Sequence, residues 1–164
     1  MGSGEAKRYY MSHGSKLVHH DALIHSIDGK YTHDPETHSR PDRLKSGGHG
    51  QVSMEIMDAN HIGYHVVHTY PNGVGIGYVP RHKYKKKSYG TGQTWFPRHW
   101  TTRDIVKAGE HVMYLKRNQG APDRHIIWGT WKGVRVGVIK QKGMAYTIFP
   151  AEYQPSSLWK KKRP

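Results

Sequence analysis

The chain has 164 residues, no cysteine and a formal net charge of +14, from 26 Lys and Arg against 12 Asp and Glu. This length is typical of one domain, and the lack of cysteine excludes disulfides and thiolate metal sites. No apolar stretch approaches the roughly 20 residues that a membrane-spanning helix needs. The excess of positive charge predicts a polyanionic partner: nucleic acid, an anionic membrane or an acidic protein.

The two ends of the chain differ in composition from its middle. Residues 1–15 are interpreted as a disordered lead-in, whose opening Gly-Ser-Gly resembles a remnant of cloning. Residues 16–150 are expected to form the single domain. Residues 151–164 form a polar tail that ends in a basic run, Lys160 to Arg163. We find no internal repeat.

Apolar spacing predicts helices in the first part of the domain. Residues 16–27 have a weak helical pattern, and residues 51–60 form a second short helix with Val52 and Ile56 on one face. The segment between them, residues 28–48, is rich in Asp, Pro, Ser, Gly and Lys and is expected to be a loop.

The pattern then changes to strands. Residues 64–70 and 74–79 read as a hairpin whose Asn72-Gly73 pair predicts a type I′ turn with positive φ at both residues. Residues 81–100 form a long loop, and loops of that length are usually functional.

The clearest helix covers residues 101–116, where Thr101 and Asp104 have the spacing of a capping box. Three strands follow, over 125–131, 134–140 and 144–149, joined by the Lys-Gly pairs 132–133 and 142–143. Tight turns pair strands antiparallel, so the chain is predicted to be α+β: N-terminal helices, then antiparallel sheets with an inserted helix.

Two segments carry candidate chemistry. His49 lies in Ser-Gly-Gly-His-Gly, where flexible backbone exposes an imidazole suited to proton transfer near neutral pH. The basic run 81–87 contains His82 and Lys83 and precedes Gly90–Pro97, which combines glycine with aromatic rings. Cations bind phosphates and aromatic rings stack on bases, so these residues indicate RNA or DNA handling.

These segments together resemble the bacterial EndoU-type nuclease domain found at the C-terminus of polymorphic and contact-dependent toxins. The resemblance covers about residues 44–150, and it is carried by the blocks 46–51, 70–73, 79–83, 90–97, 131–139 and 147–150. It implies an EndoU fold with RNase A-like (BECR-type) topology and a metal-independent endoribonuclease that needs no cofactor. In that chemistry one histidine takes the proton of a ribose 2′-OH and a second protonates the leaving 5′-oxygen. A lysine neutralises the phosphorane, and the product is a 2′,3′-cyclic phosphate.

The resemblance carries the family's residues over unevenly. One histidine matches His49, the other best matches His25 with His82 in reserve, and the lysine best matches Lys83. A terminal Thr-x-Phe-Pro segment places Thr147 and Phe149 at the nucleotide, where the ring could stack on a base. Further expected substrate contacts are Lys85, Lys86, Lys87, Thr91 and Gln93; no metal ligand is expected.

The resemblance also implies a biological setting. The domain would be delivered from the cell surface, or secreted, as part of a larger bacterial toxin and would act in the cytoplasm of the target cell. Its partners would be RNA, tRNA or another structured RNA among the candidates, and an acidic cognate immunity protein, because complementary charge speeds association. A non-catalytic RNA-binding module and a DNase toxin are the alternatives that the residues leave open.

Overall fold

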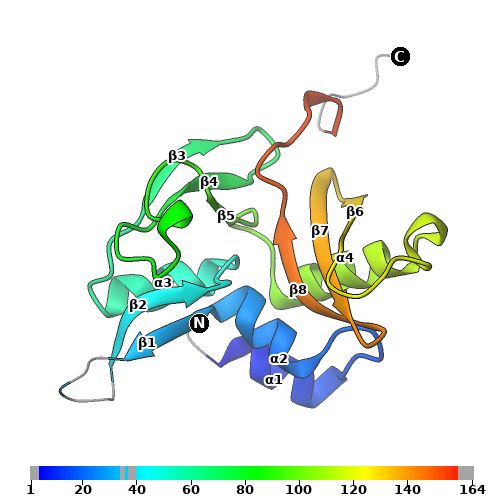
Figure 1. Cartoon of the computed structure of the whole chain (residues 1–164), viewed down its shortest axis with the longest axis horizontal. Helices are drawn as coiled ribbons and strands as arrows, with labels where there is room; N and C mark the ends of the chain where they lie inside the picture. The colour runs from blue at the N-terminus through cyan, green and yellow to red at the C-terminus, as the bar shows by residue number, and fades with distance from the viewer. Residues whose placement is uncertain (1–3, 34–35, 37–39, 159–164) are drawn as a thin grey trace.

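The computed structural model describes residues 4–33, 36 and 40–158 and confirms an α+β fold (Figure 1). The helices are α1 (Glu5–His13), α2 (His20–Leu23), the π-helical η1 (Ile24–Asp28), α3 (Gln51–Ala59) and α4 (Thr102–Tyr114). The strands are β1 (Lys30–His33), β2 (Pro41–Ser46), β3 (His65–Thr69), β4 (Gly75–Tyr78), β5 (Gln93–Trp95), β6 (Ile126–Trp131), β7 (Val134–Gln141) and β8 (Met144–Pro150). Short 3-10 turns are η2 (Lys85–Lys87), η3 (Lys116–Asn118) and η4 (Ser156–Leu158).

The strands form three antiparallel sheets, β1-β2, β3-β4-β5 and β6-β7-β8. In Figure 1 the first two sheets and α3 lie on one side of the molecule, and the third sheet lies with α4 on the other. Helices α1 and α2 run below the third sheet, and an isolated parallel bridge joins Val18 to Ala145 of β8. None of the described helices is long and apolar enough to cross a bilayer.

The third sheet and its helix follow the sequence prediction closely. Both halves of the capping box are present, because Thr101 and Asp104 each bond the other's backbone N–H. The apolar side of α4 then packs against β6, β7 and β8, and Val112 and Ile148 are fully buried there. Positive φ at both residues of each Lys-Gly turn (47° and 74°, then 52° and 76°) gives the type I′ geometry that closes these hairpins.

The middle sheet departs from the prediction at its turn. Tyr70 N–H bonds Val74 O at 2.8 Å and only Gly73 has positive φ (97°), so the loop has three residues rather than two. A turn followed by a left-handed glycine is the usual form of such a loop. Asn72 is instead recruited to hold Gln154 and Gly133 through its side-chain amide. The long loop 81–100 also contains a strand, β5, which pairs with β4.

The N-terminal predictions need two corrections. Residues 5–13, expected to be disordered, form α1, whose Ala6 is fully buried and whose Glu5 accepts a hydrogen bond from Thr102 at 3.1 Å. Residues 30–33 and 41–46, expected in a loop, pair as β1 and β2. Both elements gain their stability from contacts with distant segments, which local composition does not reveal. The basic run 160–163 lies outside the described residues.

Candidate active site

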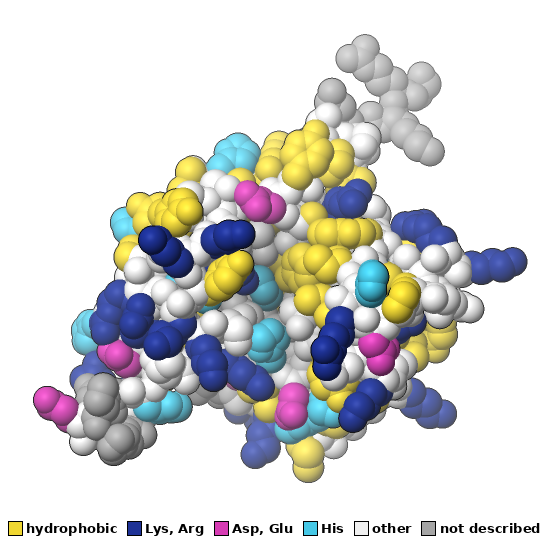
Figure 2. Space-filling view, in the orientation of Figure 1, with side chains coloured by type: hydrophobic (Ala, Val, Ile, Leu, Met, Phe, Trp, Pro, Cys, Tyr) yellow, Lys and Arg dark blue, Asp and Glu magenta, His cyan; other side chains and the backbone are white. Residues whose placement is uncertain are grey.

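A cleft of about 450 Å³ lies where the two sides of the molecule meet. It is lined by residues from η1, β2, η2, β5 and the three C-terminal strands together with neighbouring loops: His25, Ser46, Gly47, His49, Lys87, Gly92, Thr94, Trp128, Ile139, Thr147, Phe149, Pro150 and Glu152. Figure 2 shows histidine side chains inside the hollow in the middle of this face, with Lys and Arg side chains on both sides of it. The cleft therefore contains histidine side chains and is flanked by positively charged side chains.

His25 is positioned by the π-helical turn η1. The i→i+5 bond from Gly29 N–H to Ile24 O, 3.0 Å long, makes this turn one residue wider than an α-helical turn. Such turns are rare and recur at functional sites. The imidazole Nδ1 of His25 lies 3.3 Å from Ser46 Oγ, at the end of β2. The side chain is half-buried and lines the cleft.

The glycine-rich loop is tied to that turn by three consecutive backbone hydrogen bonds. Gly48, His49 and Gly50 donate their N–H groups to the carbonyls of residues 25, 26 and 27, at 2.9, 2.6 and 3.2 Å. Gly47 has a φ of 68°, and a Cβ there would lie 1.9 Å from His25 O. Glycine is required at this point, since any side chain would separate the two histidine segments.

The sequence predicted an exposed imidazole, but His49 is buried, 4% exposed, because its loop packs against η1 and β5. The tautomer of the ring is set by its surroundings. Its Nδ1 lies 2.7 Å from the carbonyl oxygen of Thr94, which can only accept, so Nδ1 carries the proton. In the neutral ring Nε2 is then the unprotonated nitrogen. Burial first, and the positive charge of Lys87 next, lower the pKa of His49 to about 3. The ring is therefore neutral at pH 7, with Nε2 as its unprotonated nitrogen.

The pKa of His25 is also lowered, to about 4, by burial and then by Lys30 and Lys87. Lys87 thus acts on both rings from one side of the cleft, and burial lowers its own pKa. Its position is fixed through the backbone, because Lys87 O accepts from Val79 N–H at 2.9 Å, at the end of β4.

The structure separates the other basic residues from this cleft. Lys83 is exposed, and its backbone N–H bonds Leu44 O at 2.9 Å, outside the lining. Lys85 and Lys86 are exposed on η2 and do not line the cleft either. His82 is buried, and its Nδ1 accepts from Tyr84 N–H at 2.8 Å. The cation beside His25 and His49 is therefore Lys87, not the predicted Lys83.

The opposite wall is aromatic. Thr147 and Phe149 both line the cleft, as two positions in one strand direct their side chains to one face. Phe149 lies 6.0 Å from the ring of His49 and 5.7 Å, edge to face, from Trp128. Gly137 of β7 pairs with Trp128 on one side and with Phe149 on the other, and a Cβ at Gly137 would come within 2.6 Å of Phe149. Trp128 was not among the predicted site residues, because a register shift between Ile139 and Lys140 places Phe149, rather than Ile148, opposite Gly137, and the Lys-Gly turns alone do not predict it.

The two remaining predicted contacts have structural partners. Gln93 is fully buried, and its side-chain amide donates to Gly47 O and Gly48 O, both at 3.1 Å, so it holds the glycine loop instead of facing the cleft. The hydroxyl of Thr91 donates to Glu152 Oε2 at 2.6 Å, at the mouth of the cleft.

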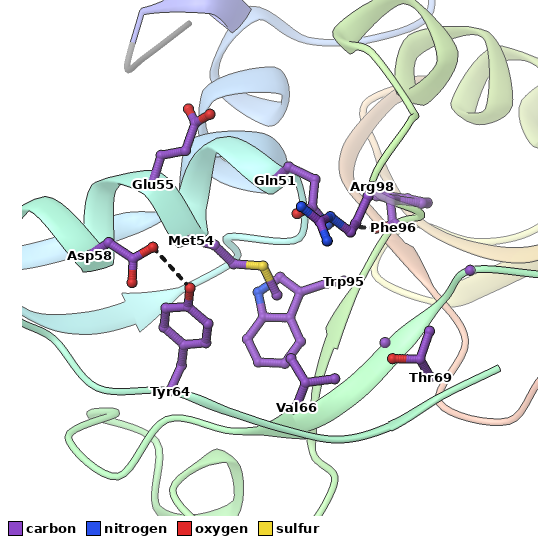
Figure 3. Close-up of a pocket in the computed structure, with 12 residues that line it drawn as sticks. Gln51, Met54, Glu55, Asp58, Tyr64, Val66, Thr69, Trp95, Phe96 and Arg98 are labelled. Atoms are coloured by element: carbon purple, nitrogen blue, oxygen red, sulfur yellow. Dashed lines mark hydrogen bonds between the residues drawn. The ribbon is translucent and has the colours of Figure 1, made fainter.

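A second cavity, of about 500 Å³, lies on the other side of β5 (Figure 3). Trp95 faces it, whereas the neighbouring Thr94 faces the histidine cleft, as alternation along a strand requires. The α3 residues Glu55 and Asp58 line it, and Asp58 accepts from Tyr64 Oη at 3.0 Å. Among the described residues of its lining, Arg98 is a cation, but there is no histidine and no lysine. Without an imidazole this cavity has no side chain suited to proton transfer near neutral pH, so the histidine cleft is the better candidate for nucleic-acid chemistry.

Fold and cleft define an α+β protein with a histidine–lysine site in a positively charged surface. A family model described as Bacterial EndoU nuclease matches residues 19–152, which include His25, His49 and Lys87. The chain belongs to this family, which confirms the resemblance and identifies the protein as a nuclease. No curated protein and no solved structure gives a match.

The backbone link between the histidine segments can be tested with Gly47→Ala. The added Cβ would clash with His25 O, and we expect a destabilised protein with little nuclease activity. Gly143→Ala is the matched control, because Gly143 has a similar φ of 76° but no atom within 4 Å of a Cβ. Its free energy of unfolding should fall only by the cost of alanine in a left-handed conformation, about 1–2 kcal/mol. Chemical denaturation and nuclease assays on both variants measure this, and equal losses would contradict the link.

Proposed function

We propose that this protein is an endoribonuclease that cleaves RNA by attack of a ribose 2′-OH on the adjacent phosphorus. The observation that carries the proposal is the convergence of His25, His49 and Lys87 on one cleft. In this reaction the 2′-oxygen bonds to phosphorus, the bond from phosphorus to the 5′-oxygen breaks, and the product is a 2′,3′-cyclic phosphate. Two proton transfers and one charge compensation are needed, and three side chains can supply them.

His49 is suited to remove the 2′-OH proton. Its Nδ1–H is held by Thr94 O, so the unprotonated nitrogen of the neutral ring is Nε2. The lowered pKa of His49 keeps this nitrogen unprotonated at pH 7. A general base must be in that state before the reaction, so we assign His49 this role.

His25 is then the acid that protonates the leaving 5′-oxygen. Lys30 and Lys87 are among the causes of its lowered pKa, after burial. A bound phosphate offsets those positive charges, which raises the pKa of His25 and favours its protonated form when substrate is present. Lys87 stabilises the extra negative charge of the phosphorane, because a cation in a partly buried site is weakly screened.

The aromatic wall is suited to hold the nucleotide. We propose that a base stacks on Phe149, while the hydroxyl of Thr147 bonds the base edge. We expect Lys85 and Lys86, which are exposed on η2, to contact phosphates farther along the RNA, and the net charge of +14 supports this expectation.

The biological proposal is a toxin nuclease that cleaves RNA inside a competitor cell, delivered from the cell surface or secreted as part of a larger bacterial protein. Membership of the bacterial EndoU nuclease family supports it. An acidic immunity protein would protect the producer, since a charge of +14 attracts an acidic partner.

The cleavage mechanism is tested by incubating the purified protein with mixed RNA and with DNA in excess EDTA. We expect RNA fragments that carry 2′,3′-cyclic phosphate ends, and intact DNA, because the route requires a 2′-OH. Loss of activity in EDTA that a divalent ion restores would contradict the proposal. Cleavage of DNA would favour the alternative of a DNase, and binding without cleavage would favour a non-catalytic RNA-binding module.

The lysine assignment is tested by comparing Lys87→Met with Lys83→Met. Removal of a positive charge raises the pKa of a nearby histidine, so the pKa values of His25 (about 4) and His49 (about 3) should both rise in Lys87→Met. NMR titration of the histidines measures this, and kcat should fall about 100- to 1,000-fold. Lys83→Met should leave both pKa values in place. A large loss of kcat in Lys83→Met instead would restore the sequence-based assignment.

A further inference from the structure

Two exposed tyrosines flank the turn η2 and are not used by the mechanism proposed above. Tyr84 is 52% exposed and Tyr89 is 60% exposed. Between them the chain carries three consecutive lysines, residues 85–87, followed by Ser88. Single exposed rings are common on protein surfaces, but two rings that enclose a run of lysines form a combination that suits single-stranded nucleic acid.

The backbone fixes both tyrosines beside the cleft. Lys87 N–H donates to Tyr84 O at 2.9 Å, so Tyr84 belongs to the same turn as the lysine that lines the cleft. Tyr89 lies in the chain between Lys87 and Gly92, and both of these residues line the cleft. The turn also packs on the segment that returns toward β5, since a Cβ at Gly92 would lie 2.5 Å from Lys86 O. Residues 84–92 therefore form a compact unit at the edge of the cleft.

The surface around the two rings is positive. Lys83, Lys85 and Lys86 are exposed. Figure 2 shows hydrophobic side chains among Lys and Arg side chains next to the hollow that contains the histidines. Exposed lysines attract the phosphates of any nucleic acid, whereas a tyrosine ring stacks on a base that is not already stacked in a duplex. The combination therefore favours a single strand.

We propose that Tyr84 and Tyr89 form a second nucleotide-binding surface, which stacks on unpaired bases on the 3′ side of the cleaved bond. This inference rests on the proposed function and adds the part of the substrate that lies outside the cleft. In the proposed mechanism the nucleoside that supplies the 2′-OH occupies the wall of Phe149 and Thr147. Lys87, which lies at the phosphorus in that mechanism, is the last residue of η2. RNA beyond the cleaved bond therefore leaves the cleft across Tyr84 and Tyr89.

The proposal narrows the class of substrate. The RNA must be single-stranded for several nucleotides after the cleaved bond, with little preference for the sequence of those nucleotides. Every base has a flat face that can stack on a ring, so stacking selects unpaired bases without selecting their identity. A loop or an unpaired end offers such bases, whereas the bases of a duplex are stacked on their neighbours.

The test compares RNAs built on one sequence that the wild-type protein cleaves. The shortest is the dinucleotide at the cleaved bond, the next carries several more unpaired nucleotides on its 3′ side, and the last carries the same extension without bases. The wild type should have a kcat/KM about 10- to 100-fold higher for the extended RNA than for the dinucleotide, as for one or two stacked bases. The abasic extension keeps every phosphate and should give much less of this gain.

Tyr84→Leu and Tyr89→Leu each remove a flat ring and keep an apolar side chain on the surface. In the double variant, the ratio of kcat/KM for the extended RNA to that for the dinucleotide should fall to the ratio that the abasic extension gives. Tyr114→Leu is the matched control, because Tyr114 is 69% exposed at the end of α4 and does not line the cleft. This variant should keep the full ratio. Thermal unfolding of all variants checks that the fold is intact.

Three results would overturn the proposal. If the double variant keeps the full gain, the rings do not contact RNA and this surface is left to a protein partner. If the abasic extension gives the same gain as the full extension, phosphate contacts alone account for it. If the gain comes from an extension on the 5′ side and is lost in the double variant, the rings lie on the other side of the cleaved bond.

Binding separates this inference from the proposed function. RNA with 2′-deoxyribose at the cleaved bond lacks the attacking hydroxyl, so equilibrium titration reports binding alone. The extended analogue should bind the wild type about 5- to 100-fold more tightly than its abasic counterpart, and the double variant should lose this difference. That result supports the tyrosine surface even if no RNA is cleaved, and in that case only the cleavage mechanism is contradicted.

Discussion

The site depends on three adjacent backbone hydrogen bonds between the π-helical turn η1 and the glycine loop. They join residues 25–27 to residues 48–50 at 2.6–3.2 Å, and they hold His25 and His49, which are 24 positions apart, in one cleft. Further bonds extend this link outward. His49 O accepts from Phe96 N–H at 2.7 Å, and Ser26 Oγ accepts from Ile148 N–H at 2.9 Å, between Thr147 and Phe149. One short segment thus orients both histidines and the strand that carries the proposed base contacts.

The electrostatics of the cleft follow from burial next to a lysine. Desolvation disfavours the charged form of an imidazole, and Lys87 adds repulsion, so His25, His49 and the buried His82 all have pKa values below the usual range. The resting site holds neutral rings and a lysine whose own pKa is lowered by burial. In the proposed mechanism, the phosphate of the substrate supplies the missing negative charge, so the protonated form of His25 is favoured only when RNA is bound. The proposal therefore couples acid catalysis to substrate binding.

Much of the fold could be predicted because its signals are local. The capping box of Thr101 and Asp104, the apolar face of α4 and the Lys-Gly turns each act within a few residues. Helix α1 and the β1-β2 hairpin could not be predicted, because residues far along the chain hold them: Thr102 donates to Glu5 of α1, and Lys83 N–H donates to Leu44 O of β2. Membership of the EndoU family, by contrast, was identified from short blocks that keep their order along the chain.

The same distinction applies to the site. His49 was singled out because glycines surround it in the sequence. The structure explains one of them: a Cβ at Gly47 would clash with the carbonyl oxygen of His25. Lys83 and Lys87 lie in one basic run, and composition cannot tell which of them faces the cleft. The turn η2 and the hydrogen bond from Val79 N–H to Lys87 O position Lys87 at the cleft. Trp128 is revealed only by the register of β6, β7 and β8, where Gly137 lets two aromatic rings meet.

The central claim, that this cleft cleaves RNA through the ribose 2′-OH, is tested most directly with a single modified nucleotide. An RNA with one mapped cleavage site is compared with the same RNA carrying 2′-deoxyribose at the nucleotide on the 5′ side of that bond. The account predicts that cleavage at this position is abolished while binding affinity changes little, because one hydroxyl is lost among many phosphate contacts. Cleavage of the deoxy-substituted bond at the original rate would contradict it.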